Sequence, residues 1–96
     1  MTNEKATDLV MALIKLTQNR EINWQRDSKA LYRTEENDLC IGIGEAKGIL
    51  CFMLDGAGAY DSMENIVGLK ELYGLVKELC QTAEEIIDAI IERANN

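Results

Sequence analysis

The sequence predicts an α+β fold made of an N-terminal helix, a four- to five-stranded antiparallel meander and a long C-terminal helix. Three patterns predict it: helical apolar spacing near the start, short strand-like runs between turn residues in the middle, and a seven-residue apolar repeat in the last third. With 96 residues, 47% of them apolar and 28% charged, the chain can build one core. We expect a single domain over residues 1–96.

The first helix is expected over residues 5–18. One of its faces is apolar, and further apolar residues leave only a narrow polar strip around the helix. Such a helix is either sandwiched inside the domain or part of a subunit contact, and we favour the contact. The apolar face consists of Ala6, Leu9, Val10, Leu13, Leu16 and Thr17.

Strands are expected over 22–26, 29–35, 39–45 and 49–54, and residues 57–60 are either a short fifth strand or a loop. Their connections are too short for a crossover, so neighbouring strands should be antiparallel. The run 49–54 is apolar on both sides, which favours a central strand that is covered on both faces. Ser62 or Asn65 is expected to cap the next helix.

The last helix is expected over 69–94, about 39 Å long at about 1.5 Å per residue. It carries three heptad tracks, which form a stripe wider than a two-stranded coiled coil needs. Strands of about six residues span only roughly 20 Å, so this helix overhangs its own sheet. Either the first helix or a second copy should cover the overhang, and we expect a homo-oligomer through the helices. The tracks are Leu69, Val76, Ala83 and Ile90; Leu72, Leu79 and Ile86; and Tyr73, Cys80, Ile87 and Ala94.

The three cysteines are Cys40, Cys51 and Cys80, each within an apolar pattern and none in a paired spacing. Free, reduced and buried thiols are therefore favoured over a zinc site or a disulfide. No apolar run is long enough to span a membrane, and the first residues lack the pattern of a signal peptide. These features predict a cytoplasmic protein.

The net charge of −7 is uneven, because residues 49–96 contain three basic and nine acidic residues. Binding of nucleic acid through a basic face is therefore disfavoured. The exception is the segment 20–33, with four basic and two acidic residues. If a small anion binds, it should bind there, through charge and aromatic stacking. The candidate ligand-binding residues are Arg20, Trp24, Arg26, Lys29, Tyr32 and Arg33.

The residues that usually carry catalysis are scarce. The chain has no histidine, which removes the commonest general base and metal ligand, and neither its cysteines nor Ser28 and Ser62 have a recognisable partner. We expect no enzyme, cofactor or metal. Four glutamates repeat every seven residues opposite the apolar stripe, and a solvated face is favoured over a divalent-cation site. They are Glu71, Glu78, Glu85 and Glu92.

Two glycine pairs leave alternatives open. Gly42 and Gly44 fall on one face of a strand, where they mean either weak packing or a flat floor that a backbone, a helix or a planar ligand can approach. Gly56 and Gly58 precede a helix, but the acidic residues around them would repel phosphate, so a turn is favoured over a phosphate-binding loop.

The first helix ends in Leu16 and Thr17, and the chain then enters the meander through Ile22 and Trp24. In these residues and in element order the chain resembles a loose group of small bacterial and phage-encoded proteins, mostly uncharacterised. The resemblance implies the helix–meander–helix order and raises the prior for a phage or prophage source, where small non-enzymatic proteins often act against host defence. It carries no site residues across.

For function we favour a non-catalytic, phage-type binding protein that sequesters a small anionic ligand, such as a nucleotide immune signal, in the host cytoplasm. The alternative is a protein-interaction module that inhibits or scaffolds a partner protein through its acidic helix or an apolar patch. A strongly salt-dependent affinity for an anion would favour the first, and a co-purifying protein the second.

Overall fold

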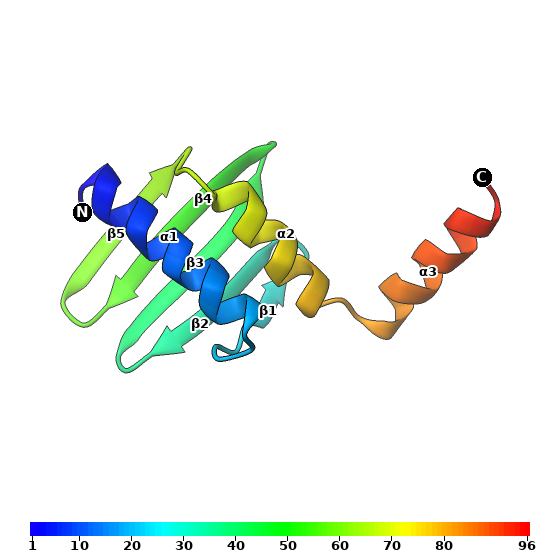
Figure 1. Cartoon of the computed structure of the whole chain (residues 1–96), viewed down its shortest axis with the longest axis horizontal. Helices are drawn as coiled ribbons and strands as arrows, with labels where there is room; N and C mark the ends of the chain where they lie inside the picture. The colour runs from blue at the N-terminus through cyan, green and yellow to red at the C-terminus, as the bar shows by residue number, and fades with distance from the viewer.

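The computed structural model describes residues 1–96 and has the expected α+β architecture: an N-terminal helix, a five-stranded antiparallel meander and two C-terminal helices (Figure 1). The strands are hydrogen-bonded in sequence order, β1-β2-β3-β4-β5. The elements are α1 (Asn3–Gln18), β1 (Gln25–Ser28), β2 (Leu31–Glu36), β3 (Leu39–Ala46), β4 (Ile49–Gly56), β5 (Ala59–Glu64), α2 (Leu69–Leu79) and α3 (Ala83–Ala94).

The core lies between one face of the sheet and two helices. Helices α1 and α2 contact each other and lie side by side over this face (Figure 1). Because side chains alternate along a strand, Tyr32, Ile43 and Phe52 all point towards the helices and are at most 1% exposed. The ring of Tyr32 meets that of Tyr73 from α2 edge-on, with centroids 5.9 Å apart.

The opposite face of the sheet carries no helix, which corrects the expectation for strand 49–54. In β4, Phe52 and Leu54 are buried under the helices, whereas Cys51 and Met53 on the other face are only half-buried. The strand does lie inside the sheet, paired with β3 on one side and β5 on the other. An apolar run on both sides of this strand therefore marks one covered face and one that is partly exposed.

The residue that precedes α2 is not one of the two expected caps. Residues 57 and 58 form a turn, and the edge strand β5 runs from Ala59 to Glu64, so Ser62 belongs to a strand. Neither Ser62 nor Asn65 caps the helix. The helix follows Gly68, whose φ of +86° is in the left-handed region. A Cβ there would lie 3.2 Å from Met11 Sδ and 3.3 Å from Val10 Cγ1. The glycine thus allows the chain to turn while touching α1.

The expected single helix over 69–94 is wrong, because the chain leaves the helix after Leu79 and begins a new one at Ala83. Thr82 is the reason. Its hydroxyl accepts a hydrogen bond from the Glu85 N–H, and the Glu85 carboxylate accepts one from the Thr82 N–H. This capping box favours a helix start at that point, whereas heptad counting registers only the apolar positions, which continue across the break.

Helix α3 extends away from the rest of the molecule (Figure 1). The Cα radius of gyration is 14.4 Å and the extents are 48 × 25 × 23 Å, whereas a compact domain of this length has a radius of gyration of about 12.5 Å. None of the helices combines the length and the apolar character needed to cross a membrane. All three cysteines are free, as expected, but they are half-buried rather than buried.

Candidate functional site

The isoleucines of α3 form an apolar surface that nothing covers. No residue of α3 is buried, and its four isoleucines are 46–54% exposed. Their spacing of three, four, seven and eight residues from Ala83 puts them on one face of the helix. They are Ile86, Ile87, Ile90 and Ile91. We call this surface the isoleucine face.

The opposite side of α3 is attached to the sheet. The Arg26 guanidinium on β1 donates a hydrogen bond to the Glu85 carboxylate, forming an ion pair. This hydrogen bond, helped by the Thr82 backbone N–H, lowers the pKa of Glu85 below its ordinary value. At 100° per residue, Glu85 lies about 200° around the helix from Ile87 and about 140° from Ile90. The ion pair therefore turns the isoleucine face away from the sheet.

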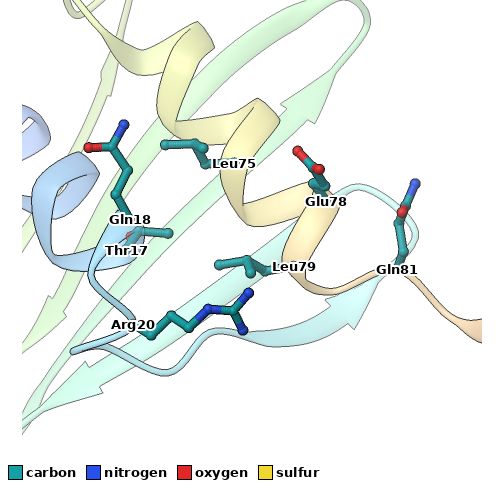
Figure 2. Close-up of a pocket in the computed structure, with 7 residues that line it drawn as sticks. All are labelled: Thr17, Gln18, Arg20, Leu75, Glu78, Leu79 and Gln81. Carbon is teal, nitrogen blue, oxygen red and sulfur yellow. The ribbon is translucent and has the colours of Figure 1, made fainter.

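A groove of about 580 Å³ opens between the C-terminal ends of α1 and α2. Figure 2 shows its lining residues, with Leu75 and Leu79 on the α2 side and Arg20 extending towards α2 from the loop after α1. Arg20 takes part in none of the ion pairs. The groove therefore combines apolar side chains with one unpaired cation. Its lining is completed by Thr17, Gln18, Glu78 and Gln81.

A second hollow continues the groove, because Arg20 and Leu79 line both. Trp24 lines this second hollow, and its indole N–H donates to the Thr17 hydroxyl at 3.0 Å. The Cys80 thiol donates to the Trp24 carbonyl at 3.6 Å, and burial raises the pKa of this thiol. These contacts fix the loop between α1 and β1 against the end of α2.

The six residues predicted to bind a small anion are only partly brought together. Arg20 and Trp24 line the same hollow. Tyr32 is 1% exposed in the core, where burial raises the pKa of its hydroxyl. Arg26, which pairs with Tyr32 across the β1–β2 ladder, is engaged by Glu85.

The two remaining residues lie elsewhere. Arg33 follows Tyr32 in β2 and therefore points to the other face of the sheet. There it contacts Asp27 at 2.8 Å and Glu35 at 3.0 Å. Lys29 lies in the turn between β1 and β2. The segment 20–33 is thus basic in sequence but forms no single cationic surface.

The glycine pairs have structural roles. A Cβ on Gly44 would lie 2.9 Å from the Ala30 carbonyl oxygen, and one on Gly42 would lie 3.3 Å from Met53 Cε. The space above these glycines is therefore filled by other parts of the same chain, namely the Ala30 backbone and the Met53 side chain. Gly58 lies in the β4–β5 turn with a φ of +77°, which confirms the turn for this residue.

Glu85 is the contact residue that the sequence did not single out. The seven-residue spacing predicts a solvated position for it, whereas in the structure it forms both the cap of α3 and the ion pair with Arg26. The sequence did contain a signal, namely the spacing Thr82-x-x-Glu85 that is typical of a capping box. No group of three or more histidine, cysteine or acidic side chains is arranged to hold a metal ion.

Comparison with models of protein families, with curated proteins and with solved structures finds no match to this chain.

Proposed function

We propose that the chain is a non-catalytic protein-interaction module whose contact surface is the isoleucine face of α3. The observation that carries this proposal is the combination of four half-exposed isoleucines on one helix with an ion pair that turns them outward. Contiguous apolar surface on a soluble domain is typical of a site that another protein covers.

An amphipathic helix that stands away from its domain is well suited to this role. Such helices dock by placing residues at i, i+3, i+4 and i+7 into an apolar groove, and Ala83, Ile86, Ile87 and Ile90 have this spacing. The helix is preformed by its capping box and by Arg26. Binding therefore requires little further ordering of the helix, which would otherwise weaken affinity.

Photo-cross-linking in the cell that produces the protein tests the proposal. A photoreactive amino acid at Ile87 should give discrete covalent adducts with protein, because this position would be covered. The same amino acid at Glu71, an exposed position on α2, should not. Equal adduct patterns from the two positions, or none from either, would contradict the proposal.

Binding of a small anionic ligand, such as a nucleotide, is a second candidate. It is favoured by one observation, that the unpaired Arg20 and Trp24 line the same hollow. It ranks second because α1 and α2 both end at the groove, and the carbonyl ends of helices repel anions.

Titration of linear and cyclic nucleotides, followed by Trp24 fluorescence, tests this candidate. If it is correct, Arg20→Ala should weaken binding roughly 10- to 150-fold, the usual effect of losing a hydrogen bond to a charged group. Lys29→Ala removes a cation outside the hollow and should leave binding unchanged. Absence of binding below about 1 mM would exclude this function.

A further inference from the structure

We infer that the isoleucine face is covered by a second copy of the chain, with α3 of each copy lying in the groove between α1 and α2 of the other. This inference rests on the proposed function and names the partner at the same site. The two surfaces that it joins are both on this chain: an apolar helix face without a cover, and a groove in which Leu75 and Leu79 lie among polar side chains.

The chemistry of the two surfaces is complementary. The groove offers Leu75 and Leu79 together with the unpaired Arg20, and it also carries the acidic Glu78. Glu84 and Asp88 border the isoleucine face on the side of Ile91. At 100° per residue, Ile91 lies about 140° around the helix from Ile86, and Glu84 and Asp88 follow at about 160° and 200°. Copies with a net charge of −7 repel each other at long range, so a contact between them needs a local cation, and Arg20 supplies one in the groove.

The groove lies next to the start of α3, so the α3 helices of two copies can exchange places over a short distance. Gln81 lines the groove, and α3 is capped by the next residue, Thr82. A two-fold axis near the segment that connects α2 to α3 would place each α3 beside the groove of the other copy. Such an interface is isologous, since the same two surfaces meet twice and the assembly closes as a dimer.

The area favours exchange over a simple pairing of α3 with α3. The helix is about 18 Å long and about 10 Å wide, so one helix face has a projected area of only about 180 Å². Stable interfaces bury roughly 800 Å² on each partner. An exchange uses a helix face and a groove on each copy, and the groove walls also enclose the flanks of the helix. The projected contact area on each copy is then about 360 Å², about twice that of a lateral pair, and enclosure of the flanks brings the buried surface closer to the roughly 800 Å² of a stable interface.

Sedimentation of the purified chain at micromolar concentration tests the inference first. The expected mass is twice the chain mass of 10.8 kDa. Ile87→Asp should weaken the dimer by roughly 30-fold or more, because a charge enters the centre of the contact. It cannot unfold the core, since α3 has no buried residue. The matched control is Ile49→Asp, at an isoleucine that is 45% exposed near the start of α2, and it should leave the dimer intact.

A charge exchange tests the orientation. Arg20→Glu should weaken the dimer by roughly 10-fold or more, whereas Lys47→Glu makes the same charge change in the β3–β4 turn and should not. Adding Asp88→Lys and Glu84→Lys to Arg20→Glu should restore association. If Arg20→Glu and Lys47→Glu have equal effects, or if the added lysines restore nothing, α3 does not lie in this groove.

The remaining outcomes separate the two proposals. A monomer with a radius of gyration near that of a compact domain, about 12.5 Å, would mean that α3 folds back onto its own chain, and would overturn the inference. Adducts from Ile87 to a different protein alone would also overturn it but would leave the interaction module standing. Equal or absent adducts from Ile87 and Glu71 would remove the proposed function itself.

Discussion

Gly44 shows how one missing side chain sets the packing at the single-residue level. The carbonyl oxygen of Ala30 accepts a hydrogen bond from the Glu45 N–H at 3.0 Å, which brings the β1–β2 turn onto β3. A Cβ on Gly44 would lie 2.9 Å from that same oxygen. The close contact is with backbone, which cannot move aside as the end of a flexible side chain can.

Gly44→Ala should therefore reduce the free energy of unfolding by about 1–3 kcal/mol, the usual effect of overpacking. Gly74→Ala is the matched substitution, because a Cβ on this helical glycine meets nothing within 4 Å, and it should raise stability by up to about 1 kcal/mol. Urea unfolding measures both. If Gly44→Ala is as stable as the unaltered chain, the β1–β2 turn that contains Ala30 can move away from the added methyl group without cost.

The charge state of Glu85 controls the attachment of α3. Hydrogen bonds from Arg26 and from the Thr82 N–H hold its pKa below the ordinary value of 4.5. A pKa that is lower in the folded state contributes stability above the unfolded value, and that contribution is lost as the pH falls through the folded value. Below about pH 4.5, α3 should thus progressively separate from β1.

NMR relaxation of the α3 amides checks this prediction, in the Ile87→Asp variant so that no second copy holds the helix. The amides should become more mobile than those of the sheet as the pH falls below 4.5, the ordinary value. Glu85→Gln should give this mobility already at neutral pH. Rigid amides in Glu85→Gln would show that the ion pair does not hold the helix.

At the scale of elements, the chain divides into a core and an appended helix. Leu69, Leu72 and Val76 of α2 are at most 2% exposed, whereas α3 has no buried residue. The heptad repeat runs through both helices, so the same sequence pattern packs on the sheet in one half and faces outward in the other.

A variant that ends at Gln81 should therefore keep the stability of the core. Its free energy of unfolding should differ by less than about 0.5 kcal/mol from that of the monomeric Ile87→Asp chain, the range of ordinary surface changes. Thermal unfolding by circular dichroism measures the difference. A clearly less stable truncated variant would indicate that α3 packs on its own core in solution.

The elements that the sequence predicted well are those with strong apolar periodicity. The first helix and the strands 29–35, 39–45 and 49–54 are confirmed within about two residues. The edge strand β5 is harder to predict because Asp61, Ser62 and Glu64 interrupt any apolar run. The prediction of one long helix was wrong because a polar capping box starts a new helix at Ala83. Counting apolar positions does not detect such a box.

The candidate site is less predictable, because residues that are close in sequence need not be close in space. Tyr32 and Arg33 are neighbours in β2, and the two-residue period of a strand sends them to opposite faces. That period was available from the sequence. The pairing of Arg26 with Glu85, 59 positions away, was not, because it depends on where the break before α3 directs the helix.

At the scale of the whole molecule, the sheet order governs how the chain folds. Each strand pairs only with its neighbour in sequence, so every strand pairing closes a short loop at low entropic cost. The contacts between segments far apart in the chain form when α2 docks on α1 and on the sheet, and when Glu85 pairs with Arg26. The chain also contains no proline, which removes the slow isomerisation that takes about 10–100 s in other proteins.

Refolding of the monomeric Ile87→Asp chain should accordingly be a single exponential that is complete within about a second. Stopped-flow fluorescence of Trp24 suits the measurement, because this residue lines a hollow with Leu79 and Cys80 at the end of α2 and therefore reports on the docking of that helix. In the unaltered chain, a slower phase whose rate rises with concentration would be the exchange of α3 between copies. A slow phase independent of concentration would contradict this account. A nascent chain with this topology can therefore complete its core before it meets a second copy.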